Sequence, residues 1–473
     1  MLALASTLIN QNQFLLHKNP NLNLFTKRNP KSLSIRLSSR LKEPERSPNS
    51  EEREEELLRS SISFPVIKAR KRVVLVRHGQ STWNEEGRIQ GSSNFSVLTK
   101  KGEAQAKTSR EMLANDAFNV CFASPLNRSK RTAEIIWGTR DDEMIFESGL
   151  REIDLYSFQG LLKNEGEKKF GAAFQQWKYD ASNFNIDGHY PVKELWSRAR
   201  NCWTKILAHE GKSILVVAHN AVNQSLVASA MGLGPEYFRL LLQSNCGVSV
   251  LDFIPRVEEG TPHICLNRLN QTPSSPIAAL NSESRKSYKR IILVCDVSTE
   301  NNIKVQEAGD CLGAESAPQN VEMKQMPNLQ VEYMLSQLNK ARNYNLVSIN
   351  FFYQTKGATD YSQLQPGWLN GVDDEITTQL WTQSEKAWNS ILDDLSDEPT
   401  SEKNVVVVGH PALHIALLVH CLNLKKELLG SFHLDGGSVS VIDFPNGPAG
   451  RGVIRCVNYT AHLGRWAIPV TIN

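Results

Sequence analysis

Several features that would place a protein in a particular class are missing from this sequence. No apolar run in its 473 residues approaches the 18 residues that a membrane-spanning helix requires, so we expect no membrane binding. The eight cysteines form no CxxC pair and do not cluster with histidine, which argues against a zinc site. A net charge of +3 is too small to indicate a polyanionic partner such as nucleic acid. The 40% apolar and 22% charged residues instead describe a globular protein, and the scattered cysteines are typical of buried thiols in a reducing compartment.

The first 42 residues contain no aspartate or glutamate, but they include seven Lys or Arg and seven Ser or Thr. This composition is typical of an organelle transit peptide, and the abundance of hydroxylated residues and asparagine favours the chloroplast over the mitochondrion. A secretory signal would instead carry a single apolar core behind its positive charges. We therefore expect a disordered transit peptide at residues 1–50, an acidic spacer at residues 51–70, and a mature protein in the chloroplast stroma.

Beyond residue 70, short apolar runs alternate with segments of helical periodicity, which predicts an α/β sandwich. Strands are predicted at residues 73–76, 120–123 and 214–218, with helices at 101–113, 129–136, 192–207 and 221–231. Thr99 would cap the first helix alone, because Gly102 stands where a capping box requires Glu or Gln. Residues 248–253 alternate less clearly and are expected to form an edge strand.

The chain also repeats itself, since RIILVCDVST at residues 290–299 mirrors RVVLVRHGQST at residues 72–82. Three further echoes follow in the same order: residues 380–392 repeat the two tryptophans of 195–207, 404–410 (NVVVVGH) repeat 213–219 (SILVVAH), and 438–444 (SVSVIDF) repeat 247–253 (GVSVLDF). Four echoes in one order indicate two copies of one fold. We expect one domain at residues 71–270, a Ser- and Pro-rich linker at 271–286, and a second domain at 287–473.

Two histidines follow predicted strands in the first copy. His78 stands in the turn RHG directly after Arg77, and His219 ends the run VVAH. Because parallel strands bind ligands beyond their carboxyl ends, both imidazoles should lie at one sheet edge. Either histidine alone would fit an exposed or helix-capping residue, but the matched strands before both favour a shared cleft.

An arginine and a glutamate add to this pattern. Arg128, in SPLNRSKRTA, comes at the start of a predicted helix, where a guanidinium and the helix N-terminus both suit a phosphate group. Arg131, one turn later, could be a second contact or a solvated helical arginine. Glu152, in LREID, has apolar neighbours, and partial desolvation there would favour its protonated form and make it a proton donor.

The segments RHGQSTWN, SPLNRSKRTA, LREID and VVAHN together resemble, in order and spacing, the histidine phosphatase superfamily, which includes the cofactor-dependent phosphoglycerate mutases. The resemblance implies two tandem phosphoglycerate-mutase-like three-layer α/β/α domains, the second a degenerate repeat. It also implies that the reaction needs neither a cofactor nor a metal ion, and that the substrate is a small phosphorylated compound.

The same resemblance implies a role for each reactive residue. His78 would be the nucleophile that forms a phosphohistidine, and Arg77, Arg128 and His219 would bind the transferred phosphoryl group. Glu152 would protonate the leaving alkoxide and later take a proton from the attacking water. A nucleophilic imidazole must be neutral, so some neighbour has to fix its tautomer, and the sequence does not name that neighbour.

Three amide side chains complete the set that the resemblance implies. Asn84 and Gln90 match positions that line the phosphate pocket of relatives. Asn220 stands beside His219 in place of the usual glycine and would also contact the substrate. The function implied is hydrolysis of a phosphate monoester.

The second copy has lost most of these residues. Cys295 stands opposite Arg77, Asp296 opposite His78, Gln354 less securely opposite Arg128, and His410 opposite His219. Aspartate can be phosphorylated in enzymes that use a bound metal, but without cations nothing here would hold a phosphate dianion. We expect a non-catalytic domain that packs against the first, shapes its cleft or mediates assembly.

Two alternatives remain open. A phosphoglycerate mutase must retain a bisphosphate, and Lys163, Lys168 and Lys169 could supply basic contacts, although such lysines are equally typical of a solvated helix. A regulatory pseudoenzyme is the other alternative, because one of the two copies has lost its reactive residues. The oligomeric state does not follow from the sequence.

Overall fold

The computed structural model of the protein describes six stretches of the chain, all within one unit that runs from Glu56 to Asn473. They are residues 64–256, 260–272, 289–295, 344–348, 374–396 and 403–463. The expected transit peptide, most of the acidic spacer and nearly all of the expected linker lie outside them, so the domain boundaries stay predictions. The described residues up to 272 are called the N-terminal half below, and those from 289 onward the C-terminal half.

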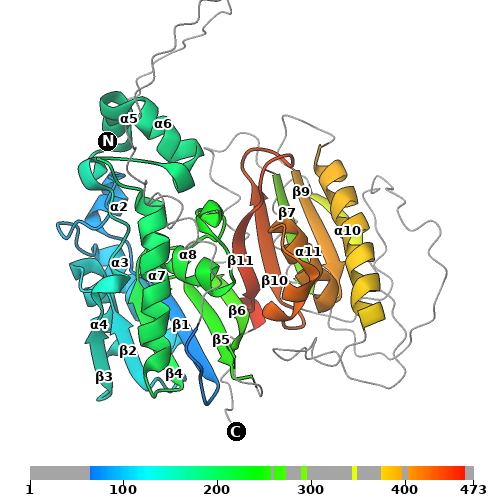
Figure 1. The fold of residues 1–473 in the computed structure, drawn as a ribbon, viewed down its shortest axis with the longest axis horizontal. Coiled ribbons are helices and arrows are strands. Elements are labelled where there is room, and N and C mark those ends of the chain that lie inside the picture. The colour runs from blue at the N-terminus through cyan, green and yellow to red at the C-terminus, as the bar shows by residue number, and fades with distance from the viewer. Residues whose placement is uncertain are drawn as a thin grey trace, which may run out of the picture. The chain divides into compact units, whose positions relative to one another are not determined.

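Strand β1, Lys71–Arg77, lies inside the sheet of the N-terminal half (Figure 1). It pairs in parallel with β4, Ser213–Ala218, and antiparallel with β5, Val248–Ile254. Three more strands complete this part of the sheet in the order β3-β2-β4-β1-β5-β6: β2, Val120–Ala123, β3, Glu143–Phe146, and β6, His263–Gln271. The strands predicted at residues 73–76, 120–123 and 214–218 are confirmed.

The prediction of an edge strand at residues 248–253 is wrong. β5 lies between β1 and β6, and nearly its whole length is buried. Its polar side chains have partners inside the protein, since Asp252 accepts a hydrogen bond from Arg72 Nε at 2.9 Å and Ser249 Oγ accepts one from the Asn270 amide at 3.0 Å. Because these polar side chains are hydrogen-bonded inside the protein, the strand that carries them can lie in the interior of the sheet.

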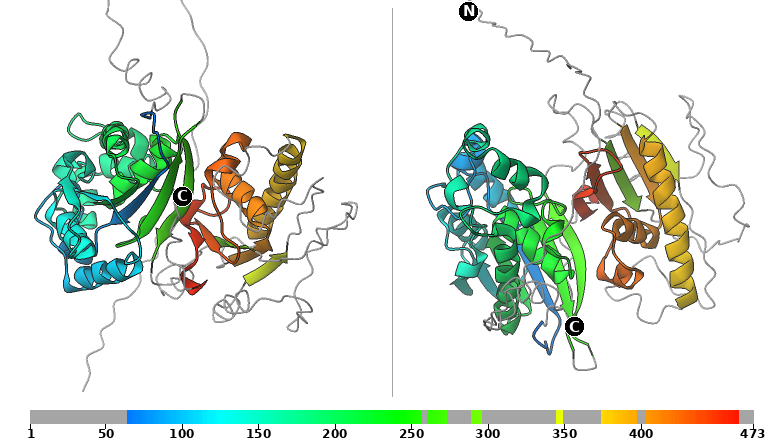
Figure 2. Two further views of the ribbon diagram at one scale, coloured as in Figure 1. Left: turned by 90° about the horizontal axis from the view of Figure 1, so that it is seen from below. Right: turned by 45° about the horizontal axis from the view of Figure 1, so that its top comes forward.

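Helices cover both faces of the N-terminal sheet, as the α/β/α prediction requires (Figures 1 and 2). On one face, Val73 and Leu75 pack in the same core as α7 and α8, and on the other, Val74 and Val76 pack with α3 and α4. This division follows from the alternation of side chains along a strand. The helices are α3, Lys100–Met112, α4, Asn127–Trp137, α7, Pro191–Ala208, and α8, Asn220–Ala230, which confirms the four predicted helices.

The start of α3 shows why its capping box is incomplete. Thr99 Oγ1 accepts a hydrogen bond from the Gly102 amide at 3.1 Å, so Thr99 caps the helix as predicted. A Cβ atom on Gly102 would lie 2.0 Å from the carbonyl oxygen of Gln80. Only glycine therefore fits where a capping box would place Glu, because the helix packs directly against the backbone that follows His78.

The C-terminal half repeats the strand order of the N-terminal half. Its order β8-β9-β7-β10-β11 matches β2-β4-β1-β5-β6 position by position, and β6 meets β11 through Leu269 and Val457 to give one 11-stranded sheet. Helix α11 follows β9 as α8 follows β4. The elements are β7, Lys289–Cys295, β8, Tyr344–Ser348, α10, Asp374–Ser396, β9, Lys403–Gly409, α11, Pro411–Cys421, β10, Val439–Phe444, and β11, Val453–Tyr459.

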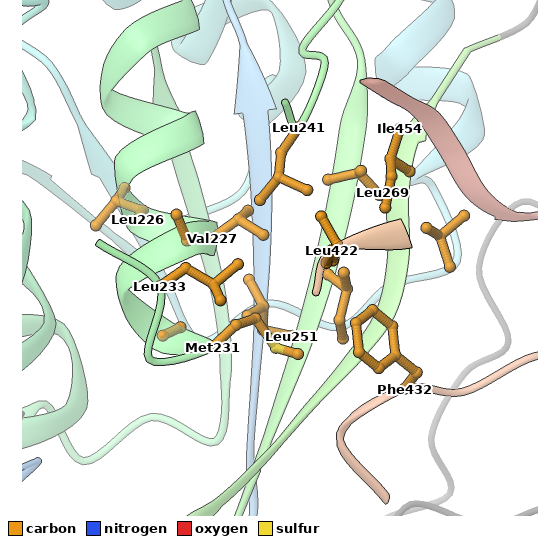
Figure 3. Packing of buried hydrophobic residues seen from close by; sticks show 14 of the residues in the cluster. Leu226, Val227, Met231, Leu233, Leu241, Leu251, Leu269, Leu422, Phe432 and Ile454 are labelled. Atoms are coloured by element: carbon orange, nitrogen blue, oxygen red, sulfur yellow. The ribbon is translucent and has the colours of Figure 1, made fainter. Parts of the chain in front are cut away.

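Apolar side chains from both halves pack together beside this junction (Figure 3). Leu241 and Leu269 come from the N-terminal half, whereas Leu422, Phe432 and Ile454 come from the C-terminal half, and each is at most 2% exposed. Burial of this kind stabilises by about 25 cal/mol per Å² of apolar surface removed from water. The cluster therefore favours a fixed arrangement of the elements that carry these residues.

The remaining elements are short. They are the helices α2, Thr82–Glu86, α5, Lys163–Phe170, and α6, Ala172–Tyr179, and the 3-10 turns Ser148–Leu150, Tyr156–Phe158, Ala181–Asn183, Pro235–Tyr237, Lys426–Ser431 and Ala461–Leu463. Within the described ranges, no helix is long and apolar enough to span a membrane, and no group of three His, Cys, Asp or Glu residues could hold a metal ion. The seven cysteines described there are not in disulfide bonds, and all except the half-buried Cys421 are buried, as predicted.

Candidate active site

The parallel pairing of β1 with β4 brings two histidines together. Arg77 lies opposite Ala218 in the register, so His78 and His219, the next residues of the two strands, emerge side by side. The amide of His78 donates a hydrogen bond to Ala218 O at 3.0 Å, and the two ring centroids are 5.1 Å apart. Both side chains are buried, at 2% and 0% exposure. The two imidazoles therefore lie side by side at one sheet edge, as the sequence suggested.

The tautomer of His78 is fixed by the backbone. Its Nδ1 lies 2.7 Å from Gly79 O, and a carbonyl oxygen can only accept, so Nδ1 carries the proton and Nε2 keeps its lone pair. Burial, followed by the charges of Arg128 and Arg77, lowers the pKa of His78 well below its usual value of 6.5. The imidazole is thus neutral at pH 7, with Nε2 available as a nucleophile. Gly79 is the neighbour that the sequence did not name.

The two arginines are held by backbone carbonyls. Arg128, which is 0% exposed, donates from Nη1 to Ser93 O at 2.6 Å and from Nη2 to Gly91 O at 2.9 Å. Arg77 donates from Nη1 to Gln243 O at 2.8 Å. Burial lowers the pKa of Arg128 to about 10, an effect that nearby Glu152 opposes, so the guanidinium remains cationic at neutral pH. Two fixed positive charges therefore lie beside the neutral His78.

Three nitrogen atoms around His78 are buried and have no hydrogen-bond partner among the described residues: Arg77 Nε, Arg128 Nε and His219 Nδ1. The other ring nitrogen of His219 lies 2.7 Å from Ser124 Oγ. Buried polar atoms are normally bonded, and each unmet donor costs about 1–3 kcal/mol. A phosphoryl group, with several acceptor oxygens, would satisfy such a set of donors.

Glu152 lies at the N-terminus of α8 and is 7% exposed. Both of its carboxylate oxygens accept the Ala221 amide at 3.1 Å, and Oε1 also accepts the Val222 amide at 3.1 Å. These are among the amides that a helix leaves unbonded at its first turn. The glutamate is buried, as the sequence suggested. The orientation of its carboxylate is fixed by the helix amides, a contact that the local sequence did not indicate.

A polar network joins the expected pocket residues Asn84 and Gln90 to the nucleophile. Ser81 Oγ lies 3.0 Å from both Asn84 Oδ1 and Gln90 Oε1. Asn245 Nδ2 donates to Asn84 Oδ1 at 3.3 Å and to the carbonyl oxygen of His78 at 3.0 Å. Asn245 was not predicted, because nothing in its local sequence marks it and its partners lie more than 160 residues away.

Two other predicted contacts have other partners in the structure. Asn220 Oδ1 accepts a hydrogen bond from Gln224 Nε2 at 3.0 Å, within α8. Arg131 is exposed, and it forms ion pairs with Glu103 at 3.0 Å and Glu134 at 3.5 Å. Of the two alternatives for Arg131, the structure therefore favours the solvated helical arginine.

The chain is similar to several known proteins. Residues 73–260 match the family model of the histidine phosphatase superfamily (branch 1). The chain is 55% identical over 472 residues to the probable 2-carboxy-D-arabinitol-1-phosphatase of Arabidopsis thaliana, with 88% of this chain and 93% of that protein covered. It is 51% identical over 461 residues to the 2-carboxy-D-arabinitol-1-phosphatase of Triticum aestivum, with 86% and 90% covered.

A bacterial relative matches only part of the chain. The probable phosphoglycerate mutase GpmB of Salmonella choleraesuis is 34% identical over 186 residues, which is 38% of this chain and 84% of that protein. The two plant relatives, in contrast, cover most of the chain and most of their own length. This chain belongs to the histidine phosphatase superfamily.

Proposed function

We propose that the protein is a phosphatase that hydrolyses 2-carboxy-D-arabinitol 1-phosphate to 2-carboxy-D-arabinitol and phosphate in the chloroplast stroma, and thereby removes an inhibitor of the carbon-fixing enzyme Rubisco. The reaction type is supported above all by the neutral His78, whose Nε2 keeps its lone pair beside the buried guanidinium of Arg128 and the half-buried guanidinium of Arg77. The choice of substrate is supported by the names of the two plant relatives. The acid-free N-terminal composition supports the compartment.

The reaction proceeds in two displacements. His78 Nε2 attacks the phosphorus atom, a P–N bond forms, and the bond from phosphorus to the C1 oxygen of the sugar acid breaks. Glu152, in its protonated form, gives its proton to the leaving oxygen. A water molecule then attacks the phosphohistidine while Glu152 takes a proton from it, and inorganic phosphate and neutral His78 are released. One water is consumed, and no proton is gained or lost by the enzyme.

Fixed charges supply much of the acceleration. Uncatalysed hydrolysis of phosphate monoesters is so slow that enzymes can accelerate it by up to about 10²¹-fold. Arg77, Arg128 and His219 present buried donors that need not reorganise when the phosphoryl group passes between oxygen and nitrogen. The carbonyl groups that hold both arginines keep these donors in place throughout the reaction.

A phosphoglycerate mutase activity is the first alternative. The lysines that could hold a second phosphate, at positions 163, 168 and 169, are all exposed on α5. Lys169 Nζ lies 5.1 Å from the centroid of the Phe170 ring, which is a surface contact on the same helix. The exposure of these lysines favours release of phosphate over its retention. A regulatory pseudoenzyme, the second alternative, is disfavoured because the N-terminal half keeps all five reactive residues together.

A substrate panel tests the proposal. The purified full chain is assayed for inorganic phosphate with 2-carboxy-D-arabinitol 1-phosphate, 3-phosphoglycerate and p-nitrophenyl phosphate, with His78→Ala as the control for contaminating phosphatases. We expect the highest kcat/KM for the first compound. Movement of phosphate between the hydroxyl groups of phosphoglycerate without release would establish the mutase, and no turnover of any ester would establish the pseudoenzyme.

A further inference from the structure

We propose that Asn270 is a positioning residue, which connects the catalytic centre to the C-terminal half of the chain. Asn270 lies near the end of β6 with a backbone φ of +54°, and its side chain is buried, at 4% exposure. Its Oδ1 accepts the Ser244 amide at 2.6 Å, and its Nδ2 donates to Arg455 O at 2.8 Å. One carboxamide therefore bridges a loop of the N-terminal half and β11 of the C-terminal half.

The loop that Asn270 holds, residues 240–247, also holds the reactive residues. Gln243 O accepts the hydrogen bond from Arg77 Nη1 at 2.8 Å. Asn245 Nδ2 donates to His78 O at 3.0 Å, and the Cys246 amide donates to Arg77 O at 3.1 Å. Because Ser244 lies between Gln243 and Asn245, a shift of the Ser244 backbone would move the atoms that orient Arg77 and His78.

The C-terminal half is also hydrogen-bonded to the start of the same loop. The Leu242 amide donates to Ile454 O at 3.0 Å, and the Ile454 amide donates to Leu240 O at 2.8 Å. Leu241, between them, is buried in the apolar cluster that also contains Ile454 (Figure 3). The loop is thus fixed at its start by the backbone of β11 and at Ser244 by Asn270. This gives the degenerate half a mechanical role that needs no reactive residue of its own.

The repeat provides a matched control for this inference. Asn458, near the end of β11, has a φ of +58° and is fully buried. Its Oδ1 accepts the Asp435 amide at 2.8 Å, and its Nδ2 donates to Asn267 O at 2.9 Å. Asn458 therefore bridges a loop of the C-terminal half and β6 of the N-terminal half, just as Asn270 bridges a loop of the N-terminal half and β11 of the C-terminal half. The loop that it holds carries no reactive residue.

The experiment compares Asn270→Gly with Asn458→Gly in the full chain. Glycine adopts a positive φ without strain, so each variant loses the carboxamide and keeps the backbone conformation. We expect both variants to lower the melting temperature by a similar amount. Only Asn270→Gly should lower kcat for phosphate monoesters, on the order of 10- to 100-fold, because a displacement of about 1 Å at a reactive group has effects of this size.

A second readout separates this inference from the proposed function on which it rests. Affinity for orthovanadate, measured by calorimetry, reports the geometry of Arg77, Arg128 and His219 even in a protein that turns over no ester. We expect it to weaken in Asn270→Gly and to stay unchanged in Asn458→Gly. Equal effects of the two variants on kcat and on vanadate affinity would reduce Asn270 to a structural residue and overturn the proposal, as would normal values in Asn270→Gly.

Discussion

The two halves of the chain have the same framework at one end of their strands and different residues at the other. In the framework, Arg72 of β1 pairs with Asp252 of β5, and Arg290 of β7 pairs in the same way with Asp443 of β10. These ion pairs are buried and connect equivalent strands. Removing one partner of such a pair costs about 3–5 kcal/mol, so the loss of either arginine or either aspartate should strongly destabilise the half that carries it.

At the carboxyl ends of the strands, the two halves carry different residues. Arg77 ends β1, whereas Cys295 ends β7, with its Sγ 3.4 Å from His414 Nδ1. His414 is fully buried, and burial lowers its pKa to about 3, so it is neutral at pH 7. The position of the arginine that we propose to bind phosphate in one half is thus occupied in the other by a buried cysteine beside a neutral histidine.

The histidines that both halves keep, His219 and His410, differ in what they bind. His410 Nδ1 accepts the Ala412 amide at 3.2 Å, so this histidine caps its own helix, α11. His219 makes no such cap, because Glu152 accepts the first amides of α8 instead. The glutamate therefore has a structural consequence besides the proton transfer that we propose for it. It leaves the ring of the equivalent histidine free to face a ligand, and this difference could not be seen from the two identical residue types.

The largest expected effect comes from substituting His78, which has no histidine counterpart in the C-terminal half. His78→Ala should lower kcat for phosphate release on the order of 10⁴-fold or more, because loss of a nucleophile removes the whole two-step path. In the other half, His410→Ala should leave kcat unchanged and cost about 1 kcal/mol of stability through its lost cap. Steady-state phosphate release and urea unfolding measure the two. A catalytic loss in His410→Ala would mean that the C-terminal half contributes directly to the chemistry.

The strands and the reactive side chains could be read from the sequence because each has a local signature. The apolar runs of β1, β2 and β4 predict buried strands, and RHG and VVAH place a histidine after two of them. β6 was missed because its residues include Asn267, Arg268 and Asn270, which would suggest solvent exposure. Arg268 and Asn270 instead bond across the junction to Asp435 and Arg455, and Asn267 donates to Asp252 within the N-terminal half.

The groups that orient the site could not be predicted for a different reason. Gly79 and Gln243 act through carbonyl oxygens, which every residue type possesses. Their role depends on where the chain brings them, and Gln243 is 166 residues from Arg77. The reactive side chains can thus be predicted from the sequence, whereas the backbone contacts that orient them form only in the folded protein.

Glu152→Gln should have the next largest effect. Glutamine can still accept one α8 amide, but it cannot give a proton to the leaving oxygen or take one from water, and such catalysis contributes about 10²- to 10⁴-fold. We expect kcat to fall in this range, and with p-nitrophenyl phosphate, whose leaving group needs no proton, we expect the phosphohistidine of His78 to accumulate during turnover. Rapid acid-free quenching with ³¹P NMR would detect this intermediate. An undiminished kcat would transfer the proton-handling role to another group.

The pH profile should shift when a cation beside His78 is removed. His78 reacts in its neutral form, and its pKa lies well below 6.5 because of burial, Arg128 and Arg77, so kcat/KM should hold as the pH falls through 6.5 and decline only at lower pH. Arg128→Gln removes one cause, which raises the pKa of His78 and moves the acid limb to higher pH, in addition to weakening phosphate binding. Arg131→Gln, on the same helix but exposed, is the control that should leave the limb in place. Identical acid limbs in both variants would show that Arg128 does not act on His78.

The smallest expected effect concerns the stability of the C-terminal half. The pKa of His414 is about 3 in the folded protein and about 6.5 in the unfolded chain, so the unfolded chain takes up the proton first as the pH falls. The stability linked to this residue is therefore fully present above pH 6.5 and is lost on the way down to pH 3. Between pH 7 and pH 5 the loss amounts to roughly 2 kcal/mol, at about 1.4 kcal/mol per pKa unit.

His414→Leu should remove this part of the pH dependence in urea unfolding while kcat at pH 7 stays unchanged. Because burial acts on His78 and His219 in the same direction, some acid sensitivity should persist in the variant, and a completely flat profile would contradict their low pKa values.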